Sequence, residues 1–120
     1  MKTTIEKGAP VVTLINVFTV DPSNQNALVQ LLDDATEQVM KHLPGFVSAN
    51  IHRGLDGRHV ANYAQWISRE AMEAMLANPD AQHHMRIAES MAQAAPNLYQ
   101  VASVHRRDNE QERTSVDSKA

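Results

Sequence analysis

Residues 11–20 read VVTLINVFTV, and Asp21-Pro22 follows at once. The run is rich in β-branched residues, which favours a β-strand. Alternate side chains of a strand point to opposite faces, and here both alternating sets are largely apolar. We therefore expect a strand that is covered on both faces. Asp21 before Pro22 is the pattern of a helix N-terminus, with Asp21 as the N-cap.

The next part of the chain predicts a helix and a hairpin. Apolar residues recur at helical spacing from 27 to 43, and Pro44-Gly45 ends the pattern. Residues 46–53 and 58–67 have the composition of two strands. Asp56-Gly57 lies between them, which is a strong signal for a tight hairpin turn.

Ser68 is placed to cap a second helical region that we expect to reach about Ala95, with a break at Asn78-Pro79. Pro96 would end it, and residues 98–105 would form the last strand. The order β-α-β-β-α-β predicts an α+β, ferredoxin-like fold with a four-stranded antiparallel sheet. Right-handed crossovers place both helical regions on one face of that sheet.

The other sheet face would then be bare although the first strand is apolar on both sides, which predicts a homodimer that packs sheet against sheet. We expect three parts along the chain. An N-terminal extension covers residues 1–10, the folded domain covers 11–105, and residues 106–120 form a flexible charged tail.

Composition excludes several classes of protein. A chain of 120 residues has room for one domain, and its formal charge of −3 argues against a nucleic-acid partner. It has no cysteine, so a thiolate nucleophile and a Cys-ligated metal are excluded. No apolar run approaches membrane-spanning length, and the N-terminus lacks the pattern of a signal peptide. We expect a cytoplasmic protein without a membrane partner.

The strand before Ser68 contains the most informative polar residues. Asn62, Ala64 and Trp66 alternate along it and share one face. An amide and an indole N–H beside an aromatic wall suit a planar ligand that carries oxygen atoms. The alternative interpretation is ordinary core packing, with both polar groups satisfied within the protein.

Two further residues have both a functional and an ordinary interpretation. His52 shares a strand face with Ser48 and Asn50, so it is either a base near neutral pH or part of an edge strand that faces water. Arg86 either points to solvent, where Glu89 is a possible partner, or turns inward to stabilise a phenolate or enolate oxygen.

Motifs for bound cofactors are absent from the sequence. The six histidines include no His-x-x-x-His pair, and no phosphate-binding glycine loop or nucleophile elbow occurs. Flavin and nicotinamide fingerprints are missing as well. We expect no cofactor and no metal. Four methionines fall in the second helical region, where they either fill the core or line a pliable pocket for an aromatic ligand.

The segments PGFVSA at 44–49 and NYAQW at 62–66, with His52 and Asp56-Gly57 between them, resemble the antibiotic biosynthesis monooxygenase family. The likeness extends over residues 11–105. It implies a dimeric α+β barrel and a homodimer that binds a small aromatic substrate and O2, without flavin, haem or metal. It also implies oxidation of a polycyclic phenol or anthrone to a quinone.

The resemblance assigns roles to single residues. Asn62 and Trp66 would hold substrate oxygens, and Arg86 would stabilise the substrate anion; these three are the catalytic candidates. His52, Asn16 and Met72 are the substrate-binding candidates. Met72 stands where related enzymes have a tyrosine that handles protons, so a bound water or a histidine would have to replace it.

Two other functions stay open. A haem-degrading monooxygenase of the same fold would use Asn16 and Trp66 with His83 or His84. The other alternative is a non-catalytic dimeric ligand-binding protein.

Overall fold

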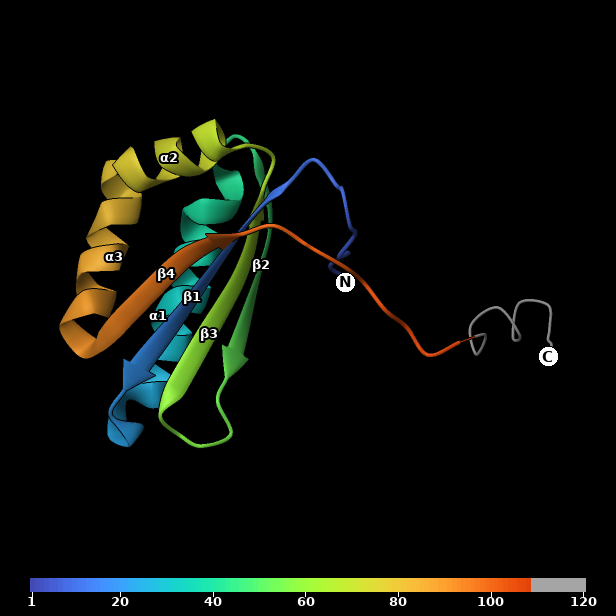
Figure 1. Ribbon diagram of the computed structural model, residues 1–120. Helices are drawn as coiled ribbons and strands as arrows, with labels where there is room; N and C mark the ends of the chain where they lie inside the picture. Colours follow the sequence, from blue (N-terminus) through green and yellow to red (C-terminus); the bar gives the residue numbers. More distant parts are fainter. Residues whose placement is uncertain (109–120) are drawn as a thin grey trace.

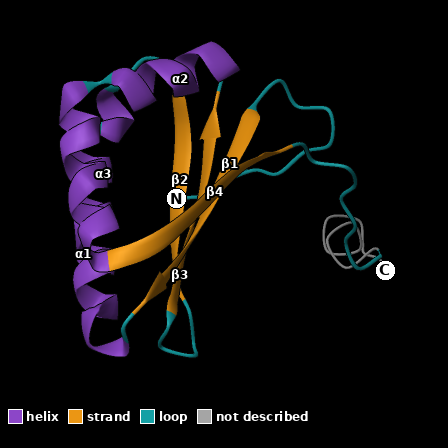
Figure 2. Ribbon diagram, turned by 60° about the vertical axis from the view of Figure 1, so that its left-hand side comes forward, coloured by secondary structure: helices purple, strands orange, loops and turns teal. Residues whose placement is uncertain are grey.

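The structure is a computed structural model, and it describes residues 1–108. Four strands form one sheet, and the helices lie together on one side of it (Figures 1 and 2). In chain order the elements are β1 (Val12–Val20), η1 (Pro22–Asn24), α1 (Gln25–Gln38), η2 (Met40–His42), β2 (Phe46–Arg53), β3 (His59–Trp66), α2 (Arg69–Ala77), α3 (Pro79–Met91) and β4 (Ala92–Tyr99). Most of the charged tail predicted at 106–120 lies outside the described residues.

The strand order is β2-β3-β1-β4, and each neighbouring pair is antiparallel. This is the ferredoxin-like α+β arrangement, so the predicted fold class is confirmed. Each of the two crossovers carries its helices to the same face of the sheet (Figure 2). None of the helices in residues 1–108 is long and apolar enough to cross a membrane.

Three local signals act as the sequence predicted. The Asp21 carboxylate accepts a hydrogen bond from the backbone N–H of Ser23 at 2.9 Å and caps η1, the 3₁₀ turn that leads into α1, whose own N-cap position is Asn24. The Ser68 hydroxyl accepts one from the N–H of Ala71 at 3.0 Å and caps α2. In the β2–β3 turn Gly57 has φ 77°, a left-handed conformation that glycine adopts without steric cost.

Three boundaries differ from the prediction, and one is the last strand, which spans Ala92–Tyr99 instead of 98–105. The first helix ends at Gln38, because Val39 leaves the helical region and a short 3₁₀ turn follows. The second helical region ends at Met91 instead of about Ala95, and Pro96 lies inside β4 instead of before it. Pro96 is tolerated because β4 is an edge strand, where a residue without an N–H need not break a ladder.

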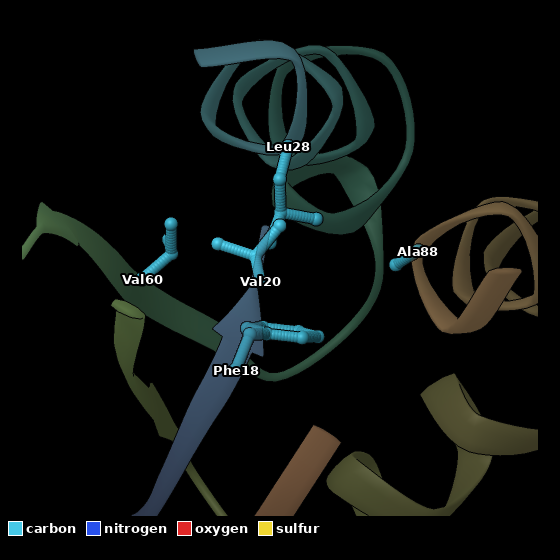
Figure 3. Close-up of a cluster of buried hydrophobic side chains, with 5 residues drawn as sticks. All are labelled: Phe18, Val20, Leu28, Val60 and Ala88. Atoms are coloured by element: carbon cyan, nitrogen blue, oxygen red, sulfur yellow. The ribbon is translucent and has the colours of Figure 1, made fainter. Parts of the chain in front are cut away.

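Two apolar clusters lie between the sheet and the helices. We call the first the core cluster; its buried members are Phe18, Val20, Leu28, Val60 and Ala88 (Figure 3). These side chains come from β1, α1, β3 and α3 and fill one end of the interface between sheet and helices. We call the second the methionine cluster; its buried members are Trp66, Met72, Met75 and Ala81, and Met40 and Met85 pack against it.

The opposite face of the sheet carries no helix (Figure 2). One end of it is covered by the N-terminal segment: the Thr3 hydroxyl donates to Asn50 Oδ1 at 2.5 Å, and Gln65 Nε2 donates to the Thr4 carbonyl at 2.9 Å. Accordingly Gln65 is buried. Further along β1, Val17 on the same face is exposed. The helix-free face is therefore half covered by its own chain and half open.

Candidate functional site

The candidate site lies on the helical face of β3. The register pairs Asn62 with Asn16 of β1, and Trp66 with Phe46 of β2. Ala64 lies between Asn62 and Trp66 on the same face, as predicted. Trp66 belongs to the methionine cluster, and Val60, two residues before Asn62, belongs to the core cluster. Asn62 thus lies where one cluster gives way to the other.

Two polar atoms of this row have no hydrogen-bond partner. Among residues 1–108, Asn62 Oδ1 and Trp66 Nε1 are the buried side-chain nitrogen or oxygen atoms without one. Leaving a buried donor or acceptor unpaired costs about 1–3 kcal/mol. Buried polar groups of folded proteins are nearly always satisfied, so each exception calls for an explanation. We call these two unpaired atoms the orphan atoms. One is an acceptor and the other a donor, and both lie on the same face of β3.

The indole of Trp66 is held firmly. Its side chain is 2% exposed, and the ring meets Phe46 edge to face, with 5.5 Å between the ring centroids. Met72 and Met75 of α2 pack in the same cluster. Because the ring cannot turn away, the direction of its N–H is fixed before any ligand arrives.

Asn16 is also held in place, by a strand rather than a helix. Its Oδ1 accepts a hydrogen bond from the backbone N–H of Ala95 in β4 at 3.1 Å. Since the amide oxygen is occupied, the NH₂ end of Asn16 is the part that remains for other partners. The structure therefore brings Asn16, Asn62, Trp66 and Met72 together on the helical side of the sheet.

His52 does not join this group. It pairs with Ala61, so it lies on the helix-free face, where it is exposed and its Nδ1 lies 3.0 Å from the Asn50 carbonyl. The predicted polar face with Ser48 and Asn50 does form: Asn50 donates to the Ser48 hydroxyl at 3.2 Å, and Ser48 donates to Gln65 at 2.7 Å. That polar face is on the other side of the sheet from Trp66.

The candidate residues of α3 lie at its surface. Arg86 is exposed, and within the described part of the chain no hydrogen bond or ion pair is found for it, so the pairing with Glu89 does not form. His83 is exposed as well. His84 is half-buried, and its Nδ1 lies 3.0 Å from the Asp80 carbonyl in the preceding turn.

An apolar hollow of about 250 Å³ adjoins the methionine cluster. Its walls include Leu43, Ala71 and Met75, which also belong to that cluster or pack against it, together with Gly45 and Ile67. Gly45 is required here: it has φ 85°, and a Cβ at this position would come within 2.4 Å of the Ala71 Cβ. The loop before β2 therefore closes tightly on α2 beside the hollow.

Among the described residues, the two carboxyl groups with a shifted pKa lie in turns, not on the strand face that carries Asn62 and Trp66. Hydrogen bonds from the Arg58 backbone N–H and then from His59 lower the pKa of the Asp56 carboxyl. Hydrogen bonds from the Ser23 hydroxyl and then from its N–H lower the pKa of the Asp21 carboxyl. Within residues 1–108 no three His, Asp or Glu side chains gather as a metal site would need.

The antibiotic biosynthesis monooxygenase family matches residues 11–87, which is more than half of the chain. This protein belongs to that family. The resemblance inferred from residues 44–49 and 62–66 is thereby confirmed. The tetracenomycin-F1 monooxygenase of Streptomyces glaucescens is 41% identical over 98 residues, which cover 82% of this chain and 88% of the relative.

Solved structures of other proteins share the fold. A monooxygenase of Streptomyces coelicolor, ActVA-Orf6, solved in complex with nanaomycin D, is 28% identical with a TM-score of 0.66, over 79% of this chain and 92% of its own. SnoaB from Streptomyces nogalater, a cofactor-independent oxygenase, is 24% identical with a TM-score of 0.68, over 80% of this chain and 97% of its own.

Sequence reasoning missed some parts of the site. It placed Asn62 and Trp66 on one face, but strand alternation cannot tell whether a polar atom finds a partner. It also missed the contact between Asn16 and Ala95, because it assigned Ala95 to a helix. The hollow beside Gly45 could have been suspected from Pro44-Gly45, since glycine often marks a close approach of backbone to a neighbour.

Proposed function

We propose that this protein is a cofactor-independent monooxygenase that uses O2 to oxidise a polycyclic phenol or anthrone to a quinone. One observation carries the proposal: a buried acceptor, Asn62 Oδ1, and a buried donor, Trp66 Nε1, both lack partners on the same strand face. A hydroxy-ketone offers the matching pair, since its hydroxyl donates to Asn62 and its carbonyl accepts from Trp66.

The shape of the row supports a flat, extended ligand. Asn62 and Trp66 are four positions apart along the strand, so their Cα atoms are about 13 Å apart at about 3.3 Å per residue. Ala64 lies between them, and because its side chain is only a methyl group it rises little above the sheet. A fused-ring ligand spanning Ala64 reaches both orphan atoms. The relative named for tetracenomycin F1, and the neighbour that binds nanaomycin D, support the same class of substrate.

The chemistry uses the electrons of the substrate. Loss of a proton from an anthrone gives an anion whose charge lies largely on the oxygen that faces Trp66, and the indole N–H stabilises that charge. The anion transfers its electrons to O2, and a carbon–oxygen bond forms, giving a hydroperoxide. Cleavage of the O–O bond with loss of the second hydrogen on that carbon releases water and leaves the quinone carbonyl. The balance is anthrone plus O2 to quinone plus water.

The surrounding residues have supporting roles in this proposal. The NH₂ group of Asn16 is free to donate to a substrate oxygen, because Ala95 holds its other end. Arg86 is exposed on α3 and contributes only a solvent-screened positive charge. Both orphan atoms are closed off from solvent, so a ligand reaches them only if the side chains over them move. Met72 and Met75 of α2 pack against Trp66, and the hollow lies beside Met75 and Ala71.

We propose in addition that a second copy of the chain covers the open half of the helix-free face. Ile15 and Val17 of β1 and Tyr63 of β3 point to this face, and Val17 is 38% exposed. Sheet-on-sheet packing of two copies would bury these side chains and give the dimeric α+β barrel. Val17→Asp is expected to give a monomeric mass in light scattering. Leu55→Asp, at the exposed hairpin tip, is the control and is expected to remain dimeric.

The activity is tested by oxygen uptake with a tricyclic hydroxyanthrone, which carries both the hydroxyl and the carbonyl, and chelator-treated protein. We expect uptake above the uncatalysed rate, with quinone formed in step, and a marked loss of rate in Asn62→Ala. Val60→Ala is the matched control: it lies on the same face of the same strand but in the core cluster, so its folded fraction should keep its rate. Uptake no faster than without enzyme would refute the proposal. A Soret shift saturating at one haemin per chain would favour the haem-degrading alternative instead.

A further inference from the structure

Methionine is concentrated around the candidate site. Met72 and Met75 are 4% and 6% exposed and pack with Trp66, and Met40 and Met85 lie against the same cluster. The thioether is readily oxidised by peroxides to the sulfoxide. Met91 packs instead against the core cluster, and Met1 is fully exposed. The chain thus carries methionines beside the site, in the other cluster and in open solvent.

We propose that Met72 and Met75 are sites of oxidative modification, converted to methionine sulfoxide by the substrate hydroperoxide that forms within the site lined by Trp66. This inference rests on the proposed function, because that reaction supplies the oxidant. Burial protects both sulfur atoms from peroxide in solution. A hydroperoxide formed on the substrate reaches them from inside the cluster.

The step balances without any other reagent. A lone pair of the methionine sulfur attacks the outer oxygen of the hydroperoxide, a sulfur–oxygen bond forms, and the O–O bond breaks. The inner oxygen leaves as an alkoxide and takes up the proton of the hydroperoxide, so the substrate ends as an alcohol. Sulfur loses two electrons and the O–O bond gains two. Each sulfoxide therefore replaces one molecule of quinone by one molecule of alcohol.

Oxidation here has a structural consequence. A sulfoxide is polar, and Met72 and Met75 are surrounded by apolar side chains of the methionine cluster. The new oxygen adds an unsatisfied polar group next to the indole that must hold the substrate. We therefore expect the enzyme to lose activity progressively during turnover, with the loss set by the number of turnovers rather than by time.

Tryptic peptides separate the methionines by location. Cleavage after Arg69 and Arg86 gives a peptide of residues 70–86 that contains Met72, Met75 and Met85, whereas residues 87–106 contain Met91 and residues 1–2 contain Met1. The full-length protein is run to inactivation with anthrone and O2 in the presence of catalase, which removes free hydrogen peroxide. We expect the oxidised fraction per methionine in peptide 70–86 to exceed that in the other two several-fold. In a second sample, hydrogen peroxide without substrate should oxidise Met1 first.

Variants identify the residue. Met72→Leu and Met75→Leu keep a flexible apolar side chain of similar volume that cannot be oxidised. Each is expected to raise the number of turnovers completed before inactivation, and the double variant to raise it most. Quinone formation with sulfoxide confined to Met1, or spread evenly over the three peptides, would overturn the inference while leaving the proposed function in place. Absence of substrate-dependent oxygen uptake would overturn both.

Discussion

The core cluster and the methionine cluster lie side by side on one face of the same sheet, yet they are built differently. The core cluster combines Phe18, Val20, Leu28 and Val60, side chains with few rotamers and no polar atoms. The methionine cluster combines Trp66 with flexible thioethers and contains an orphan indole N–H. The core cluster is closely packed, whereas the methionine cluster contains an unpaired donor and is lined by flexible thioether side chains.

The difference indicates a division of tasks within one small domain. A buried donor without a partner lowers stability unless something binds to it, and functional sites are where proteins retain such features. The core cluster supplies the stability that makes this possible. Changes in the two clusters should therefore have opposite signatures, with the core cluster governing unfolding and the methionine cluster governing activity.

The largest expected effect is on stability, in the core cluster. Leu28 is 0% exposed, and Leu28→Ala should lower the free energy of unfolding by about 3 kcal/mol, the range seen for large-to-small changes in cores. Urea unfolding followed by circular dichroism measures this loss. The rate per folded molecule should stay near that of the wild type. A loss of rate greater than the unfolded fraction explains would contradict the proposed division of tasks between the two clusters.

The next effect is on activity, in the methionine cluster. Trp66→Phe keeps a ring against Phe46 but removes the orphan N–H. A hydrogen bond to a charged group is worth about 1.5–3 kcal/mol, so initial oxygen uptake should fall roughly 10- to 100-fold. The change in unfolding free energy should be small, because a lost contact is offset by removal of an unpaired donor. Equal rates for Phe and Trp at this position would exclude the indole N–H from the reaction.

A smaller effect is expected for Arg86, which lies outside both clusters. Its side chain is exposed, and water and salt screen the charge of exposed groups. Arg86→Gln should lower the rate only a few-fold, and Arg86→Lys should restore part of it if charge is what matters. Repeating the comparison at high salt should shrink the difference between the two variants. A loss as large as that of Trp66→Phe would show that Arg86 turns inward when substrate binds.

The smallest effect concerns the exposed hairpin turn, which belongs to neither cluster. The pKa of Asp56 is lowered from its ordinary 3.8 by hydrogen bonds from the Arg58 N–H and His59. A carboxyl group with a lowered folded-state pKa contributes stability above 3.8, and the contribution is lost as the pH falls through the folded-state pKa. Asp56→Ala should therefore lower the Tm slightly at pH 7, and the difference should shrink as the pH falls below 3.8 and the carboxyl becomes protonated. A Tm difference that persists in acid would assign the effect to packing.

The sequence was informative about the fold because strong local signals agreed with one another. Asp21-Pro22, Ser68 and Asp56-Gly57 each begin or turn an element where the structure has one. The prediction failed at β4, where alanines of good helix propensity form a strand. Pairing of residues 92–99 with β1 outweighs their local preference, and single-sequence reasoning does not see such tertiary pairing.

For the site, alternation placed Asn62 and Trp66 together but could not place His52 relative to them. A bulge between Phe46 and Ser48 shifts the phase of β2 by one residue. Without it, His52 would share the face of Phe46 and Trp66. With it, His52 lies on the helix-free face. Neither the bulge nor the lack of partners at Asn62 and Trp66 has a sequence signal of its own.

The central claim is that the orphan oxygen of Asn62 is kept for substrate at a cost in stability. Asn62→Leu tests it, because leucine has a similar size and no polar atom to leave unpaired. The deciding measurement is the oxygen-uptake rate of this variant with the hydroxyanthrone, on protein whose urea unfolding has been measured in parallel. We predict an unfolding free energy equal to or above that of the wild type, with a rate lower by about tenfold or more. An unchanged rate, or a loss of rate that the unfolded fraction fully accounts for, would contradict the claim.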